Sequence, residues 1–274
     1  MANLRLIYKN VIDTAATLTA STTSGGLVAS NMQNDYKGKA HRSTTTSVTY
    51  TATWATTQNI GGVVLPATNL SGSATVRVRL YNTGGTVQIA DSGTINACPG
   101  NNIELWNWSG PLNANAFIFG GASKTAVWFS SHYAADKIVV DLVDTTNAAG
   151  YIDCSRLIAG AYWEPKYNVS NGISVEISDT STTERADSGD LVATRGTVVD
   201  RLSFDFSVLE EADRTSLTQI LRAVGTSRNI LVSVFPDNNS LLEQSHMVYG
   251  KRSNSSINAS LYGIYKHSME LEGW

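Results

Sequence analysis

Charged residues are scarce in this chain of 274 residues, where they make up 16% of the sequence. A typical soluble domain carries about 25%. The 20 Lys and Arg residues and 23 Asp and Glu residues leave a formal net charge of −3, so the chain has no general attraction to the phosphates of DNA or RNA. The composition therefore predicts that nucleic acid is not a partner.

Cysteine and long apolar runs are lacking too. Cys98 and Cys154 form no C-x-x-C pair and have no closely spaced histidines, so neither a zinc site nor a disulfide framework is indicated. Free thiols in a reducing cytoplasm are the simplest interpretation. No run of about 18 apolar residues is present, and the N-terminus lacks the apolar segment of a signal peptide. We expect a soluble protein without membrane insertion.

Motifs for catalysis are also missing. The sequence has no G-x-S-x-G, no P-loop and no G-x-G-x-x-G. The histidines are far apart in the sequence, and nothing in their spacing predicts a metal or catalytic cluster: His41, His132, His246 and His267. We therefore predict that the chain is not an enzyme and that it uses no cofactor.

Two carboxylate pairs deserve a comparison with glycosidases. Asp141 with Asp144, and Glu184 with Asp187, have a spacing of three, which in strands or loops fixes no useful separation across a sugar. Solvated charges are the favoured alternative. A calcium site at Asp144 or Asp153 lacks the ligand pattern of known calcium loops. We expect no metal.

Hydroxyl-bearing residues are what the chain has in abundance. Ten of the fifteen residues in 43–57 are Ser or Thr. The segment has a period of two, with apolar residues on one face (Val48, Tyr50, Ala52 and Trp54) and threonines on the other. This alternation predicts a strand with one buried face and one wet face.

Runs typical of strands dominate the first 165 residues, and turn residues rich in Gly, Asn, Ser and Thr separate them. The expected strands are Leu4–Val11, Ser47–Trp54, Gly61–Pro66, Ala74–Tyr81, Thr86–Ala90, Ala126–Phe129, Lys137–Val143 and Leu157–Trp163. Many short strands at regular spacing favour a β-sandwich of the jelly-roll kind.

The pattern breaks at Pro165, which removes an amide donor and restricts the residue before it. We place a domain boundary there, with a β-sandwich over residues 1–165 and a smaller α+β domain over 166–274. The second part has ten Lys and Arg against fourteen Asp and Glu, and is therefore the acidic one. Its expected strands are Gly172–Ser178, Asp200–Phe206, Asn229–Phe235, His246–Lys251 and Tyr262–Glu272.

One helix is predicted in this second part, at about residues 208–224. Ser207 and Glu210 match a capping box, and Gly225 follows as a stop. Four apolar residues recur at helical spacing: Leu217, Ile220, Leu221 and Val224. They need an apolar partner, which the alternating Leu202, Phe204 and Phe206 of a strand would offer. The fold class is therefore mainly β, with one helix packed on the second sheet.

Two tryptophans stand among amides within the sandwich segment. Trp106 and Trp108 would share one face of a strand, beside Asn102 and Asn107. An aromatic face next to amides suits sugar recognition, so these four residues are candidate glycan contacts. Burial in the core or at a subunit interface is the favoured alternative.

Arg77 and Arg79 alternate with apolar residues and would lie on one sheet face. Two readings stay open for them. They are solvated or paired with acids across the sheet, or they form a salt bridge between subunits.

Two sets of segments resemble known families. Residues 29–43, the Thr-rich strand ending at Trp54, and residues 60–66 resemble discoidin-like, galactose-binding-like β-sandwiches. Residues 202–206 with the predicted helix, and the runs 225–236 and 246–251, are similar to the C-terminal part of virion structural proteins of tailed bacteriophages, of the distal tail or baseplate type.

The resemblance implies a tail or baseplate component that assembles in the bacterial host cytoplasm and ends in the virion. It implies partners among other tail proteins and copies of itself in a symmetric homo-oligomer, with a ring as the expected form. No catalytic or ligand residue is carried over. The alternative function is recognition of a host surface glycan by the sandwich, and a third hypothesis is a glycan-degrading enzyme.

Overall fold

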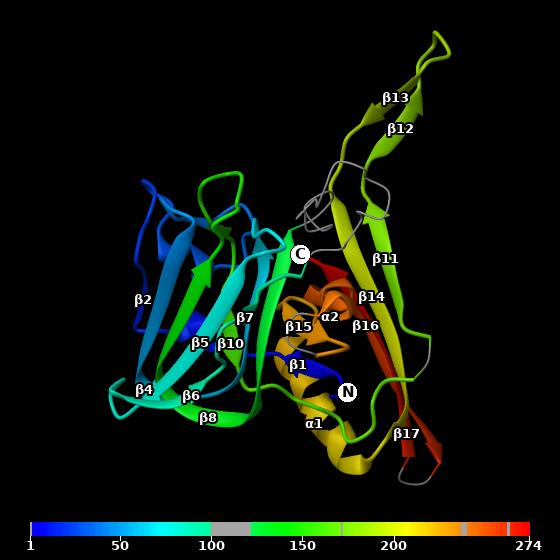
Figure 1. Cartoon of the computed structure of the whole chain (residues 1–274). Coiled ribbons are helices and arrows are strands. Elements are labelled where there is room, and N and C mark those ends of the chain that lie inside the picture. Colours follow the sequence, from blue (N-terminus) through cyan, green and yellow to red (C-terminus); the bar gives the residue numbers. More distant parts are fainter. Residues whose placement is uncertain (1, 100–121, 171, 237–239, 262–263) are drawn as a thin grey trace, which may run out of the picture.

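The computed structural model of the chain describes residues 2–99, 122–170, 172–236, 240–261 and 264–274. Its strands form a nine-stranded sheet, a six-stranded sheet and a two-stranded ribbon, and two α-helices lie in the described part. The predicted fold class, mainly β with a sandwich and a helix on a second sheet, is confirmed (Figure 1).

The nine-stranded sheet builds the β-sandwich. Its central order is β3-β9-β4-β8-β5-β6, with β2 and β10 paired to β4 and β7 paired to β5. The strands are β2 (Thr17–Ala20), β3 (His41–Arg42), β4 (Ser47–Thr68), β5 (Thr75–Asn82), β6 (Val87–Asp91), β7 (Ile95–Asn96), β8 (Ser123–Val143), β9 (Asp153–Cys154) and β10 (Ile158–Gly160). Two 3-10 turns, η1 (Val11–Thr14) and η2 (Ala29–Gln33), lie between the early strands.

Two strands are much longer than the sequence predicts. β4 joins the expected strands Ser47–Trp54 and Gly61–Pro66, and β8 joins Ala126–Phe129 and Lys137–Val143. Irregularities in the β4–β8 register at three places let the paired strands bend without a break, as β8 does at the base of the sandwich in Figure 1. Strand periodicity does not distinguish such a bend from a turn.

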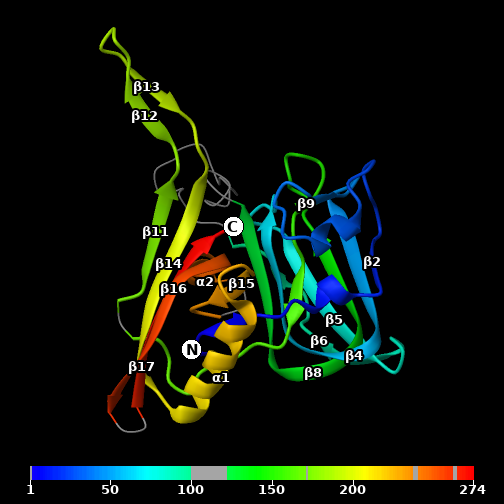
Figure 2. The ribbon, with the colours of Figure 1, turned by 180° about the vertical axis from the view of Figure 1, so that it is seen from behind.

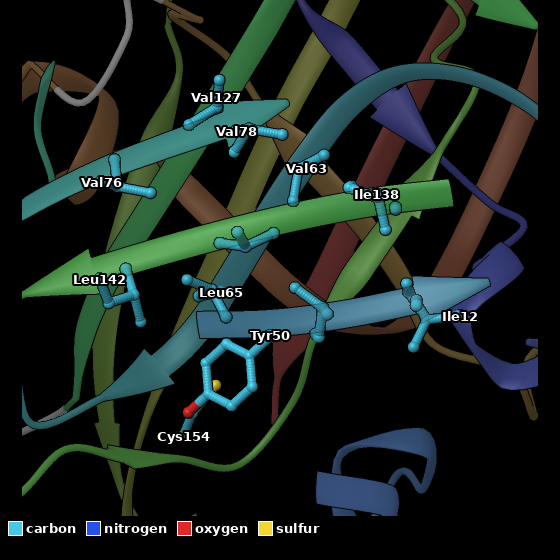
Figure 3. Packing of buried hydrophobic residues seen from close by; sticks show 14 of the residues in the cluster. Ile12, Tyr50, Val63, Leu65, Val76, Val78, Val127, Ile138, Leu142 and Cys154 are labelled. Atoms are coloured by element: carbon cyan, nitrogen blue, oxygen red, sulfur yellow. The ribbon is translucent and has the colours of Figure 1, made fainter. Parts of the chain in front are cut away.

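The bend brings the two halves of these strands around one apolar core. In Figure 3, Tyr50 and Val63 of β4 lie in the same cluster as Val78 of β5 and Ile138 of β8. Tyr50 is fully buried, and Val48, Ala52 and Trp54 are buried with it. The predicted inward face of the Thr-rich strand is therefore confirmed.

The six-stranded sheet has the order β1-β15-β16-β17-β14-β11. Its strands are β1 (Arg5–Ile7), β11 (Ser174–Asp179), β14 (Val198–Leu209), β15 (Ile230–Ser233), β16 (Met247–Leu261) and β17 (Ile264–Gly273). β1 comes from the start of the chain and pairs with β15. The domain boundary at residue 165 stays a prediction. The two sheets do not divide the chain at that residue, because β1, near the N-terminus, belongs to the six-stranded sheet.

Helix α1 (Glu211–Val224) covers one face of this sheet, and a short α2 (Leu241–Ser245) follows β15. The predicted stripe of α1 is buried against the predicted strand face, in a cluster that holds Phe204, Phe206 and Leu217. Gly225 ends the helix with a φ of 62°, as expected.

The predicted capping box is wrong. Glu210 is the N-cap residue and makes no side-chain cap hydrogen bond. Ser207 lies in β14, where its hydroxyl contacts the hydroxyl of Ser170. The register of β14 with β17 shifts after Phe206, and the pairing resumes at Leu209. Residues 207–209 therefore belong to the strand instead of the helix start.

A third apolar cluster joins the sandwich to the six-stranded sheet. Trp128 of β8 and Ile158 of β10 pack there against Leu231 of β15 and Tyr249 of β16. The Trp128 indole also donates a 2.6 Å hydrogen bond to the buried carboxyl group of Glu243 in α2. None of the described helices is long and apolar enough to cross a membrane.

Candidate functional site: a projecting arm

A β-hairpin extends from the six-stranded sheet far beyond the helix that covers the sheet. Strands β11 and β14 pair from Ser174–Ser203 to Asp179–Val198, and β12 (Thr182–Arg185) and β13 (Leu191–Thr194) continue the hairpin to its tip. We call residues 177–198 the arm. Figures 1 and 2 both show it leading away from the sandwich.

Local interactions hold the arm in one shape. At its middle, where the ladder is interrupted, the Ser181 hydroxyl accepts a 2.8 Å hydrogen bond from the amide of Gly196. A side chain at Gly196 would collide with the backbone of Thr180, 2.4 Å away. At the tip Gly189 has a φ of 88°, a conformation that favours glycine. Among the described residues, the hydrogen bonds of 179–198 stay within the arm.

The arm exposes four large apolar side chains. Ile177 is 73% exposed, Leu191 65%, Val192 57% and Val198 41%. Two of them continue the buried face of the sheet, because Val198 lies on the same face of β14 as Leu202 and Ile177 lies on the same face of β11 as Val175. The same face also carries Asp200 opposite Ile177 and Asp179 opposite Val198. Past the point where its own chain covers it, the sheet therefore exposes a mixture of apolar and acidic side chains.

The arm also carries charge, mostly negative. Residues 177–198 contain four acidic and two basic residues, a net charge of −2. Two of the acids are Glu184 and Asp187, which the sequence offers as a carboxylate pair. Glu184 lies on β12 opposite Val192, and Asp187 in the exposed turn. They are solvated charges on a projecting hairpin, which is the alternative favoured above.

Both paired arginines find carboxylates within the chain. Arg77 makes two hydrogen bonds to Asp91, at 3.0 and 2.6 Å. Arg79 pairs with Asp141 at 2.5 Å, which also accepts from Thr49. These contacts correspond to the cross-sheet alternative, and a salt bridge between subunits stays a prediction.

The tryptophan candidates lie outside the described residues. Trp106, Trp108, Asn102 and Asn107 all fall in the segment 100–121. The glycan and interface readings of these four residues stay predictions.

Another aromatic group lies where β3 pairs with β9 in the sandwich. Arg42 donates two 2.8 Å hydrogen bonds to Asp153, and its guanidinium lies 4.1 Å from the ring centroid of Tyr151. The Arg42 side chain is 37% exposed and that of Asp153 28%. The group combines a planar ring, hydrogen-bond donors and acceptors at the surface. Residue patterns do not reveal this group, because Arg42 and Tyr151 are far apart along the chain.

The histidines do not come together as a cluster. His41 is buried and contacts the Tyr50 hydroxyl at 2.9 Å, while burial lowers the pKa of its imidazole. His132 packs on Tyr162, and His267 stacks on Phe206. Across the described ranges, no group of three or more His, Cys, Asp or Glu residues is arranged to hold a metal.

Asp144 and the two cysteines have structural surroundings. Asp144 is fully buried and accepts hydrogen bonds from the amide and hydroxyl of Ser71, at 2.7 and 2.5 Å. Cys98 and Cys154 are buried free thiols, and burial raises the pKa of the Cys154 thiol to about 12. A thiol of that pKa is protonated at neutral pH and unreactive.

The strands predicted from the sequence do not include the hairpin tip either. A signal was present, because two β-branched stretches around 182–185 and 191–194 flank the turn sequence Asp187-Ser188-Gly189-Asp190. Sequence does not show that the resulting hairpin stays uncovered.

Comparisons with known proteins concern the sandwich. No family model and no curated protein sequence matches the chain. A fucose-binding module from Streptococcus pneumoniae is 14% identical with a TM-score of 0.35, and the match covers 55% of this chain and 95% of that one. The family 32 CBM from C. perfringens NanJ, in complex with galactose, is 12% identical with a TM-score of 0.39, covering 56% and 98%.

Chitosan-binding module 1 of a Paenibacillus chitosanase/glucanase is similar to the same degree, at 14% identity and a TM-score of 0.38, covering 56% of this chain and 99% of that one. By their own descriptions these neighbours are sugar-binding modules. Likeness at such identities and TM-scores carries no inference about function, and the fold class rests on the strand pairing described above.

Proposed function

We propose that the chain is a non-catalytic component of a protein assembly, and that the arm joins it to its neighbours, copies of the same chain included. One observation carries this conclusion. A projecting hairpin exposes Ile177, Leu191, Val192 and Val198, while in the described part the hydrogen bonds of residues 179–198 stay within the hairpin. Apolar side chains gathered on one exposed element are typical of an interaction site.

The shape of the arm favours assembly over a role in stability. A hairpin that packs on nothing buries little apolar area and contributes little to folding, and two-stranded hairpins alone are marginally stable. Packing on another molecule would bury the same side chains. Internal hydrogen bonds and continuity with the sheet already order the arm before it binds. Association therefore loses little further conformational entropy of the arm.

The finer proposal is that this assembly is the tail or baseplate of a tailed-phage virion, put together in the bacterial host cytoplasm. It is supported by the resemblance of residues 202–206, 225–236 and 246–251 to virion structural proteins. Direct evidence would come from locating the chain in purified particles by mass spectrometry and particle imaging.

The test of the arm uses an arm variant with the four exposed apolar residues changed together: Ile177→Thr, Leu191→Thr, Val192→Thr and Val198→Thr. Threonine keeps the preference for strands and removes apolar surface. We expect sedimentation equilibrium to show concentration-dependent association of the wild-type chain. The arm variant should have a dissociation constant raised by about tenfold or more.

The matched control changes Val87 and Val143 to Thr, since both are exposed valines on sandwich strands, at 51% and 40%. This control should associate as the wild type does, and far-UV circular dichroism should be the same for all three proteins. A wild-type chain that stays monomeric at every concentration, or an arm variant that associates normally, would refute the proposal.

A second candidate function is glycan binding by the sandwich. The group of Arg42, Tyr151 and Asp153 favours it, because a ring stacks on sugar C–H groups and the charged pair supplies donors and acceptors for hydroxyls. A glycan array tests it. Specific binding that is lost on Tyr151→Ala, with self-association intact, would establish this function beside the first, and an array without specific binding would remove it.

A further inference from the structure

We infer that the arm of one molecule docks on a second copy of the same chain, on the loop of residues 28–39 in the sandwich. We call this segment the receiving loop. The inference rests on the proposed function, and adds to it the identity of the partner and the surface that the partner offers.

The receiving loop presents an aromatic ring beside a cation. Tyr36 is 67% exposed, and Val28 on the same loop is 42% exposed. The Lys39 ammonium lies 5.3 Å from the centroid of the Tyr36 ring. Lys37 is exposed and donates a 3.1 Å hydrogen bond to the carbonyl oxygen of Trp274. The segment therefore exposes an aromatic ring, an aliphatic side chain and two ammonium groups.

The one acid of the receiving loop is used internally. The Asp35 carboxylate pairs with Arg156 at 2.9 Å and accepts from the Tyr249 hydroxyl, while its backbone oxygen accepts a 2.6 Å hydrogen bond from the Trp274 indole. These bonds anchor the loop to both sheets. The Asp35 side chain is still 48% exposed, so a partner meets it together with the two lysines, which give residues 28–39 a net charge of +1.

The arm complements this surface in both respects. Its tip, residues 184–190, contains three acids and one arginine and has a net charge of −2. The exposed Leu191 and Val192 follow directly. Opposite charges at the rim of an interface set register and speed association, and an aliphatic side chain against Tyr36 would bury apolar area from both partners.

The arm and the receiving loop of one molecule do not meet. The arm leads out of the second sheet through the pairing of β11 with β14, and in Figures 1 and 2 its tip points away from the body. The receiving loop, in contrast, is bonded to Trp274, at the end marked C between the two sheets in Figure 1. A contact between two different surfaces is heterologous, so repeated docking forms a ring if it closes and a filament if it does not.

The experiment is a complementation between two variants. The loop variant carries Tyr36→Ala, Lys37→Glu and Lys39→Glu, and keeps its arm. The arm variant described above keeps its receiving loop. We expect each to be monomeric alone, and an equimolar mixture to form a one-to-one heterodimer, seen by light scattering after size exclusion. Only one productive contact is left in the mixture.

The control variant, Tyr8→Ala with Lys9→Glu, changes the same residue types at another exposed place on the chain. It should associate as the wild type does. Raising the salt concentration should weaken wild-type association through the screened lysines and acids, and should have a smaller effect on a chain with Lys37→Gln and Lys39→Gln.

The outcomes separate the two claims. A loop variant that associates like the wild type would overturn this inference and leave the proposed function standing, because the arm would then dock elsewhere. An arm variant that associates like the wild type would overturn both. Two monomeric variants that form no heterodimer when mixed would also refute the docking of the arm on the receiving loop.

Discussion

Arg156 is the single residue on which the joint between the two sheets most depends. Its side chain is 1% exposed and pairs with Asp13 at 2.8 Å and Asp35 at 2.9 Å. It also donates to the Met32 carbonyl and, at 3.4 Å, to the Tyr249 hydroxyl. A buried guanidinium is costly unless its donors are satisfied, and here the sandwich and the second sheet supply the acceptors together.

Arg156→Met should lower the free energy of unfolding by about 3 kcal/mol, because it removes one partner of a buried charged network. Urea denaturation measures the loss. The matched control is Arg42→Met, where the pair with Asp153 lies at the surface. Its loss should be much smaller, and equal losses would show that burial is not the cause.

At Asp91, a lowered pKa predicts how the stability of the fold changes with pH. The hydrogen bonds from Arg77 hold the pKa of its carboxyl at about 2, below the ordinary value of 3.8. A lowered folded-state pKa contributes stability above the ordinary value, and that contribution is lost as the pH falls from 3.8 towards 2. Because the pair is largely exposed, the contribution is small.

We therefore expect Asp91→Asn to be slightly less stable than the wild type at pH 6, with the difference gone near pH 2. Denaturation at a series of pH values measures it. A difference that stays constant down to pH 2 would mean that the carboxylate charge is not its source.

At the scale of elements, α1 shows how a strand can displace a helix start. Ser207 and Glu210 have the right types and spacing for a capping box, but β14 keeps residues up to Leu209 in its pairing with β17. Strand pairing with a neighbour outweighs a cap that contributes about 1 kcal/mol. The C-terminal end of α1 has no such competitor.

Gly225→Ala should cost about 1–3 kcal/mol, because Gly225 has φ 62° and ψ −145°, a conformation that alanine adopts only with strain. Ser207→Ala should change stability by less than about 0.5 kcal/mol, as expected for a surface position. Thermal unfolding compares the two. Gly26→Ala, at a glycine with ordinary φ and open space, is the control and should be neutral.

At the scale of the whole molecule, the third apolar cluster and the Arg156 network make one body of two sheets. Trp128 lies at the centre of the joint, 7% exposed, with its indole bonded to Glu243. A rigid joint fixes the distance and the orientation between the arm and the receiving loop of one molecule. Such rigidity is what a closed ring requires.

Trp128→Ala should therefore cost about 3–5 kcal/mol and should separate unfolding into two steps, one for each sheet. Hydrogen exchange of amides in β5 and in β17 would follow the two parts independently. In the wild type both should exchange with one global free energy. If the variant still unfolds in a single step, the joint is not what couples the sheets.

Much of this protein could be predicted from residue patterns. The alternation of Val48, Tyr50, Ala52 and Trp54 set the buried face of the Thr-rich strand, because side chains of a strand alternate and water drives the apolar set inward. The stripe of α1 and the strand face of Leu202, Phe204 and Phe206 were predictable for the same reason, and Gly225 because its conformation is local.

Tertiary structure decided the rest. Pairing between distant strands bent β4 and β8 into continuous strands, moved β1 into the second sheet and took Ser207 from the helix. The Arg42, Tyr151 and Asp153 group and the Arg156 network join residues that are far apart in the sequence. The same is true of the arm, since a period of two shows which side chains share a face, and only the arrangement of the whole chain shows whether anything covers that face.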